Sequence, residues 1–296
     1  MTTELAVTTP AFLDLTFVGL EALPGPGEER YAGDLLRSPG GGAITAVAAA
    51  RLGLRTALVA PLGTDLAGDF VKREVEAEGV TVAGARPDRT PQTVVMPVGG
   101  ERAMVTIDPG VRARGADLAA LTPAAVAANV EQLAIIPDGT RVYLTCGDDD
   151  ARAFSGRPPA RLKAARALFA SAQDACVLTA AGSPEEAAER LAESVETVVL
   201  TLAAPDVLAL TGGRRIEVPD FDGGPVVDPT GDRDLLCAAF AWAELRGAGV
   251  EAALGWAQLY SRLAMRVPTA TGGAVTEERL LAEGAERGLQ PPAGVG

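Results

Sequence analysis

The residues best suited to chemistry lie in one short segment, Val227–Leu236, where an apolar run ends in a Pro-Thr-Gly turn. An Ala- and Leu-rich segment follows to about Arg246, which predicts a strand, a tight turn and the start of a helix. A helix N-terminus presents unpaired N–H groups and a partial positive charge, which favour phosphate. Asp234 would lie in the first helical turn, where its carboxylate could accept a proton from a substrate hydroxyl.

A second glycine-rich segment, Pro39–Gly53, lies far upstream and continues through Pro61–Gly68 to Glu78–Val80. Its pattern is a glycine turn followed by an Ala-rich helix, and alanine allows a helix to pack closely on a sheet. The segment therefore has a packing role whether or not it also binds a ligand. Its functional meaning depends on being paired with the later turn.

The two segments together resemble the signatures of the PfkB/ribokinase family of carbohydrate and nucleoside kinases. The upstream segment is similar to G-G-x-x-x-N-x-A-x-x-x-A-R-L-G, and the downstream segment to D-[TP]-T-G-A-G-D-x-F. With weaker similarity elsewhere, the resemblance covers most of the chain. It implies ATP-dependent phosphorylation of a sugar hydroxyl, with Asp234 as general base and ATP and Mg²⁺ as cofactors. The turn Gly272–Ala274 resembles a late family turn near adenine and a monovalent cation.

The resemblance is incomplete at the phosphate-binding turn. Thr230 and Gly231 match the family, but Asp232 and Arg233 replace the Ala-Gly whose amides help to form the anion hole. The family glycine suggests a backbone conformation that would be costly for Arg233. Arg233 could pair with Asp232, bind phosphate, or form a solvated charge pair. The alternative to a kinase is a catalytically impaired, pseudokinase-like protein that binds a sugar or a partner, and a nucleoside kinase is the nearest enzymatic variant.

The other nucleotide-side motifs are altered as well. Ser171–Asp174 takes the place of the family's N-x-x-E, which leaves Asp174 to organise Mg²⁺ through water. The family's T-x-G-x-x-G corresponds to Thr201–Asp206, without either glycine. The resemblance makes four residues candidates for nucleotide binding: Thr201, Ala203, Asp206 and Gly273.

On the sugar side, Asp14 follows apolar residues on the first predicted strand and matches the family Asp that hydrogen-bonds sugar hydroxyls. A buried carboxylate needs partners, whereas a solvent-facing position on a half-exposed strand would not. The family Asn falls at Ile44, or near Thr45 if one glycine is inserted. The candidate substrate-binding residues are Asp14, Gly40, Gly41, Gly42 and Thr45. Arg102 and Met104 could face the site or the surface.

Composition narrows the function further. The chain has 296 residues, 48% of them hydrophobic, and a net charge of −13 without a basic run, which argues against nucleic acid as a partner. It contains no histidine, so histidine bases and triads are excluded. The three cysteines are scattered, and neither a signal peptide nor a membrane span is evident, so we expect a cytoplasmic protein. The expected partners are a sugar or nucleoside and a second copy bound through the lid.

The remaining pattern predicts the fold. Strands are expected near 12–20, 31–37, 55–60, 142–145 and 197–202, and hairpins at 93–107 and 207–218. Helices are expected at 43–52, 66–78, 122–133, 232–246, 250–266 and 276–287, with another opening at Ser183. Alternating strands and helices predict one domain over 1–296, a ribokinase-like three-layer α/β/α Rossmann-type core. The segments 12–20, 31–37 and 93–107 form a small β-lid, 290–296 is a mobile tail, and Asp148–Asp150 is a solvated acidic loop rather than a cation site.

Overall fold

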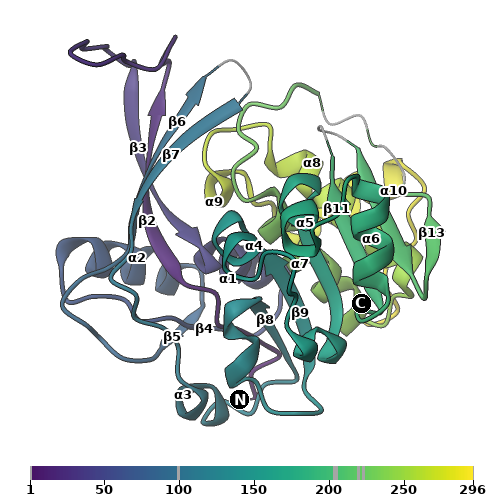
Figure 1. The fold of residues 1–296 in the computed structure, drawn as a ribbon. Coiled ribbons are helices and arrows are strands. Elements are labelled where there is room, and N and C mark those ends of the chain that lie inside the picture. Colours follow the sequence, from purple (N-terminus) through teal and green to yellow (C-terminus); the bar gives the residue numbers. More distant parts are fainter. Residues whose placement is uncertain (1, 99–100, 203–205, 219–220, 222–223, 296) are drawn as a thin grey trace.

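The computed structural model describes residues 2–98, 101–202, 206–218, 221 and 224–295. In these ranges nine strands form one sheet, in the order β13-β12-β11-β10-β9-β8-β1-β4-β5 (Figure 1). All pairs are parallel except β11 with β12 and β12 with β13. The strands are β1 Leu5–Val7, β4 Thr56–Val59, β5 Thr81–Ala83, β8 Ala125–Asn129, β9 Arg141–Cys146, β10 Ala165–Ser171, β11 Thr197–Thr201, β12 Val207–Thr211 and β13 Arg214–Ile216.

Helices cover both faces of this sheet, which confirms the three-layer α/β/α prediction. They are α1 Gly42–Arg51, α2 Leu66–Ala77, α3 Gly115–Ala119, α4 Asp148–Ala153, α5 Ala172–Thr179, α6 Pro184–Ala192, α7 Asp232–Leu245, α8 Val250–Ala264, α9 Ala270–Gly273 and α10 Glu277–Glu286. Alternate strand residues serve the two cores: Leu5 and Val7 pack with α1 and α7, whereas Ala6 packs with the opposite layer.

The prediction of a helix over 122–133 is wrong. Strand β8 lies there, paired with β1 on one side and β9 on the other, and only the short 3-10 helix Glu131–Ile135 is helical. The alanines of β8 favour a helix locally, but burial between two parallel neighbours overrides that preference. Strands β1 and β10 were not predicted, because three apolar residues or an Ala-rich run carry little periodic signal.

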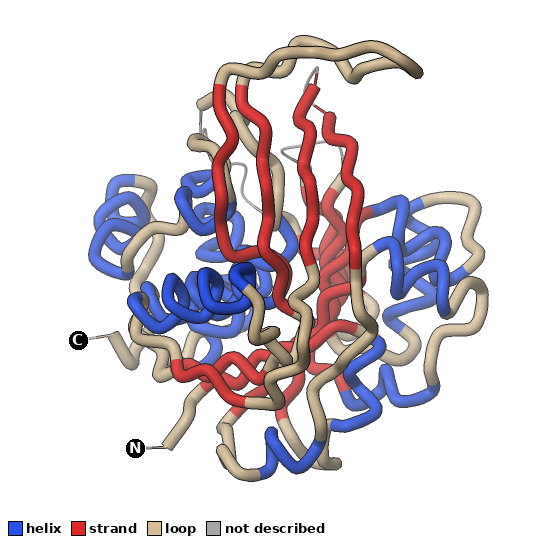
Figure 2. The backbone as a smooth tube through the Cα atoms, turned by 90° about the vertical axis from the view of Figure 1, so that its left-hand side faces the viewer, coloured by secondary structure: helices blue, strands red, loops and turns tan. Residues whose placement is uncertain are grey.

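A second sheet, the lid sheet, contains the three segments that the sequence assigns to a lid. Its order is β3-β2-β6-β7, with β2 parallel to β6 and the other pairs antiparallel. The four strands rise from the body of the molecule (Figure 2). They are β2 Ala11–Val18, β3 Asp34–Gly41, β6 Gln92–Val98 and β7 Glu101–Ile107.

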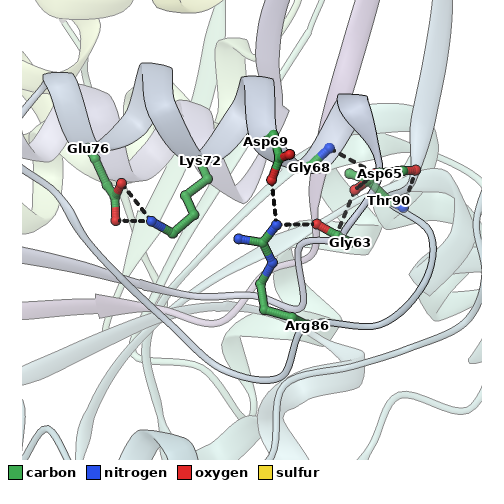
Figure 3. Close-up of polar contacts among 8 residues, drawn as sticks. All are labelled: Gly63, Asp65, Gly68, Asp69, Lys72, Glu76, Arg86 and Thr90. Atoms are coloured by element: carbon green, nitrogen blue, oxygen red, sulfur yellow. Dashed lines mark hydrogen bonds and ion pairs between the residues drawn. The ribbon is translucent and has the colours of Figure 1, made fainter.

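A polar cluster holds the entry to β6 against the start of α2 (Figure 3). Asp65 caps α2, because its Oδ1 accepts from the Gly68 amide at 2.9 Å and from the Thr90 Oγ1 at 2.6 Å. Arg86 donates to the Gly63 carbonyl and to Asp69, both at 2.7 Å. Since Thr90 lies just before β6, this cluster anchors one base of the lid sheet to the body.

The C-terminal helices form the part of the core behind the site. Trp242 of α7 and Trp256 of α8 are fully buried and meet edge to face, with ring centroids 5.8 Å apart. The tail after Leu289 returns to this region. The Trp256 indole donates to the Gln290 carbonyl at 3.0 Å, and the Gly294 amide donates to the Arg246 carbonyl at 2.8 Å. Mobility of the tail stays a prediction.

Candidate functional site

The turn before α7 is built around Gly231. This residue has φ 75° and ψ 13°, the left-handed conformation that glycine adopts readily. A Cβ here would lie 2.8 Å from both the Ala270 Cβ and the Ile44 Cδ1. Asp228 braces the turn, because its carboxylate accepts from the Thr230 and Thr269 amides, each at 2.9 Å. Gly231 therefore starts α7 tightly against α1 and α9.

Asp234 lies in the first turn of α7, as predicted. Thr45 of α1 is buried and donates from its hydroxyl to the Asp234 Oδ1 at 3.2 Å, so the structure brings the two predicted residues together. Burial raises the pKa of Asp234 to about 6, against the opposing influence of the Arg233 charge and the Thr45 hydrogen bond. The carboxylate is thus mainly ionised near neutral pH and is able to accept a proton.

Asp14 lies on β2 of the lid sheet, opposite Ser38 of β3 and Thr93 of β6. Its side chain is buried, with 7% of the residue exposed, so the solvent-facing interpretation is wrong. Burial, together with the charges of Asp234 and Asp228, raises the pKa of Asp14 to about 7, against the opposing charge of Arg102. In the described part of the chain no hydrogen bond reaches this carboxylate.

The glycines at the junction of β3 and α1 make room for these neighbours. A Cβ on Gly40 would overlap the Asp14 carboxylate, so this glycine makes the position of Asp14 possible. Gly41 has φ 56°, and a Cβ on it would overlap Phe12. A Cβ on Gly42 would overlap the Thr9 carbonyl. Packing thus explains all three glycines, and their predicted contact with a sugar stays a prediction.

Arg102, which the sequence left between site and surface, reaches the site from β7 of the lid sheet. Its Nη1 donates to the Pro229 carbonyl at 2.9 Å. Burial lowers the pKa of Arg102, the Arg233 charge lowers it further, and the charge of Asp228 opposes this. Met104 is exposed. The sequence could not predict the contact of Arg102 with the turn before α7, because one charged residue on a hairpin forms no recognisable motif.

Arg233 does not pair with Asp232 among the described residues. Arg233 forms an ion pair with Asp174, and its Nη1 also donates to the Cys146 carbonyl at 2.8 Å. Asp232 instead accepts from the Ser261 hydroxyl of α8 at 2.5 Å. Arg233 also lies inside α7 with a helical backbone, so the predicted conformational cost of an arginine there is wrong.

Asp174 lies in the first turn of α5. Besides the ion pair with Arg233, its Oδ2 accepts from the Ser171 hydroxyl at 2.7 Å, and the Ser171 Oγ accepts from the Asp174 amide. The Oδ2 of Asp174 is therefore engaged by Arg233 and Ser171, and the predicted role of Asp174 in organising Mg²⁺ stays a prediction. Across the described ranges no group of three or more acidic or cysteine residues is arranged to hold a metal ion.

The remaining nucleotide-side candidates are Thr201, Ala203, Asp206 and Gly273. In the described residues none of them forms a hydrogen bond or ion pair with Arg233 or Asp174. Thr201 ends β11, and the Leu202 amide donates to the carbonyl of the exposed Asp206 at 2.9 Å. Ala203 lies outside the described residues. A Cβ on Gly273 would overlap the Ala264 carbonyl, so close packing of α9 on α8 accounts for that glycine.

The acidic run Asp148–Asp150 begins helix α4, so the prediction of a solvated loop is wrong for Asp150. The buried Asp150 carboxylate accepts from the Glu131 amide at 2.9 Å and the Val130 amide at 3.2 Å. Burial raises its pKa to about 6, although these hydrogen bonds oppose the shift. Asp150 therefore ties α4 to the end of β8 and serves the structure.

A three-layer α/β/α body joined to a four-stranded lid sheet is the ribokinase-like architecture. Residues 13–277 match the model of the pfkB family carbohydrate kinases, so the chain belongs to this family. It is 28% identical over 279 residues to the ribokinase of Bacillus subtilis (strain 168), covering 87% of this chain and 91% of that relative. No helix in the described ranges has the length and apolar character needed to cross a membrane.

Solved structures show the same fold. The ribokinase of Arabidopsis thaliana, complexed with ribose and ATP, has a TM-score of 0.77 and 22% identity, with 96% of this chain and 99% of that chain covered. The nucleoside kinase of Methanocaldococcus jannaschii has a TM-score of 0.76 and 16% identity, with coverage of 96% and 99%. The likeness in fold therefore includes both a ribokinase and a nucleoside kinase.

Proposed function

We propose that this protein transfers a phosphoryl group from ATP to a hydroxyl of a small sugar, with Asp234 as the general base. One observation carries the proposal: the buried Asp14 carboxylate has no hydrogen-bond partner in the described chain and lies close enough to Asp234 for the two charges to interact. A buried carboxylate without a partner is costly, and the hydroxyls of a sugar supply the missing donors. Family membership supports the same reaction class.

Asp234 has the properties that proton transfer requires. A base works best when its pKa lies near the working pH, and burial raises the pKa of the Asp234 carboxyl to about 6. The Thr45 hydroxyl fixes the orientation of the carboxylate. The N-terminus of α7 adds a partial positive charge beside the acceptor oxygen, where negative charge develops during phosphoryl transfer.

Substrate binding involves both sheets. Asp14 comes from β2, whereas Asp234 and Thr45 come from helices of the body. Arg102 links β7 to the turn before α7, so the lid sheet and the turn are held together at the site. A bound sugar would lie between Asp14 and Asp234, with water excluded by the lid sheet.

The test is a phosphorylation screen of sugars and nucleosides with ATP, comparing the parent with Asp234→Asn. We expect the parent to phosphorylate at least one sugar and the variant to lose most turnover. If the parent phosphorylates nucleosides but no sugar, the proposed acceptor is a nucleoside instead of a sugar. The absence of product with every acceptor would overturn the proposal.

A second candidate is a catalytically impaired protein that binds a sugar or a partner. The ion pair between Arg233 and Asp174 favours it, because this pair occupies the carboxylate that the family resemblance assigns to the metal. Thermal unfolding with and without sugar and nucleotide separates the candidates. Stabilisation by sugar, together with none by nucleotide, would support the impaired protein.

We also propose a homodimer through the lid sheet. Strand β7 is at the edge of that sheet and exposes Met104, Val105 and Ile107. Exposed apolar residues on an unpaired edge strand favour association with another chain. Light scattering would show a dimer in the parent and a monomer in Val105→Lys; a monomeric parent would exclude it.

A further inference from the structure

Arg233 connects three elements at the carboxyl ends of the central strands. It is the second residue of α7, it donates to the Cys146 carbonyl at the end of β9, and it pairs with Asp174 at the start of α5. Its side chain is 23% exposed, and the Asp174 side chain is 10% exposed. A cation is therefore built into the region where the carboxyl ends of parallel strands form binding sites in α/β folds.

This guanidinium group keeps unused hydrogen-bonding capacity. Both of its contacts with described residues use Nη1, so Nη2 and Nε have no partner in that part of the chain. Arg102 likewise uses only Nη1, toward the Pro229 carbonyl. The two arginines also lie near enough for the charge of Arg233 to lower the pKa of Arg102. Two neighbouring guanidinium groups with free donors favour an anion between or beside them.

The carboxylates beside the turn are already engaged. Asp228 accepts from two backbone amides, and Asp232 accepts from the Ser261 hydroxyl. Burial raises the pKa of Asp232, against the opposing hydrogen bond from Ser261 and the charge of Arg233. In contrast, the amides of Arg233 and Asp234 at the start of α7 have no hydrogen-bond partner in the described residues, whereas the Asp232 amide donates to the Pro229 carbonyl. The turn therefore offers donors and a fixed cation to an anionic ligand.

We propose that Arg233 binds the phosphate oxygens of the nucleotide and serves as the cation that Asp174 would otherwise hold as a hydrated metal ion. The inference rests on the proposed function. A guanidinium group can keep its ion pair through one edge and donate to a phosphate through the other. The consequence is specific to this chain: nucleotide affinity depends on Arg233 and only weakly on Mg²⁺.

The test measures ADP and ATP binding by calorimetry, once in EDTA and once in excess Mg²⁺. Four variants accompany the parent: Arg233→Gln, Asp174→Asn, the double variant Arg233→Gln/Asp174→Asn, and the control Arg114→Gln. Arg114 forms an exposed ion pair with Asp117 on α3. The double variant does not leave a buried Asp174 carboxylate without its arginine, so it tests binding if Arg233→Gln alone folds poorly.

We expect the parent to bind nucleotide in EDTA, with a dissociation constant within about threefold of its value in Mg²⁺. Arg233→Gln and the double variant should bind about 10- to 100-fold more weakly, the usual loss for a charge-assisted hydrogen bond. Arg114→Gln should bind like the parent, and Asp174→Asn, which removes the negative charge beside Arg233, should bind at least as tightly as the parent.

Three results would overturn the inference: binding only with Mg²⁺, tighter binding by Arg233→Gln, or no nucleotide binding by the parent under either condition. The first leaves the proposed kinase function standing. Nucleotide binding in EDTA without phosphorylation of any acceptor would instead refute the kinase function and leave the inference standing.

Discussion

The two sides of the site differ in the hydrogen-bond partners of their buried carboxylates. On the lid side, Asp14 is buried without a hydrogen-bond partner in the described residues, and its pKa rises to about 7. On the opposite side, Asp174 is equally buried but is bonded to Arg233 and Ser171. The first carboxylate is left for a ligand, whereas the second already has partners in the protein through its Oδ2.

This difference shows that burial alone does not identify a binding group. A buried carboxylate indicates a ligand only when the protein leaves its oxygens without donors. By this criterion the Asp14 carboxylate on the lid side is able to accept hydrogen bonds from a polyhydroxyl substrate. The nucleotide side must offer its arginine and the amides of α7 instead of a free carboxylate.

The largest expected effect concerns the base. Asp234→Asn should lower the turnover number by about 10²- to 10⁴-fold, because it removes general-base catalysis, while sugar affinity stays nearly unchanged. Steady-state kinetics and sugar titration measure the two quantities, with the exposed Asp138→Asn as control. An unchanged turnover number would exclude Asp234 as the base.

The next effect concerns the cost of burying Asp14. Its pKa is about 7 in the folded protein and 3.8 in a free side chain, so stability is lost as the pH rises from about 4 through 7. Asp14→Asn removes this cost and should raise the free energy of unfolding by about 2 to 4 kcal/mol above pH 7. The gain should shrink toward pH 4, and sugar binding should be lost.

Denaturant unfolding at several pH values measures this gain. Asp138→Asn again provides the comparison, since its carboxylate is exposed. A gain that does not vary with pH would mean that the Asp14 carboxylate is not destabilised by its surroundings.

A smaller effect is expected at the junction of β3 and α1. Gly40→Ala places a methyl group on the Asp14 carboxylate and should raise the Michaelis constant for the sugar by about tenfold, as expected when one good hydrogen bond is displaced. Gly249→Ala is the matched control, because a Cβ there meets no atom within 4 Å. Equal constants for parent and Gly40→Ala would contradict the role of Asp14.

The smallest effect is expected at Asp232. Asp232 is an acidic residue at the predicted phosphate-binding turn, and repulsion between its charge and ATP would make Asp232→Ala bind ATP more tightly. In the structure its carboxyl accepts from Ser261 and its pKa is raised by burial. We therefore expect ATP affinity to change by less than about threefold, even at low salt. Titration at two salt concentrations, with Ser261→Ala alongside, checks this; a tenfold gain would restore the repulsion hypothesis.

Most of the fold was predictable where the periodic signal was long. Helices α7, α8 and α10 and the lid hairpin follow directly from apolar spacing and turn residues. Strand β8 was not predictable, because an alanine run supports either a helix or a fully buried strand. Its neighbours β1 and β9 decide the choice, and they come from distant parts of the chain.

The sequence by itself determined the family, the position of Asp234 at the start of a helix, and the association of Asp14 with a lid. These features depend on local motifs, which short-range backbone preferences translate into structure. Only the tertiary structure decided the partners of Asp232 and Arg233, because side chains adjacent in sequence point in different directions on a helix. Asp232 met Ser261 and Arg233 met Asp174, 29 and 59 residues away. Charge pairing therefore followed the packing of α7, α8 and α5, which no local pattern encodes.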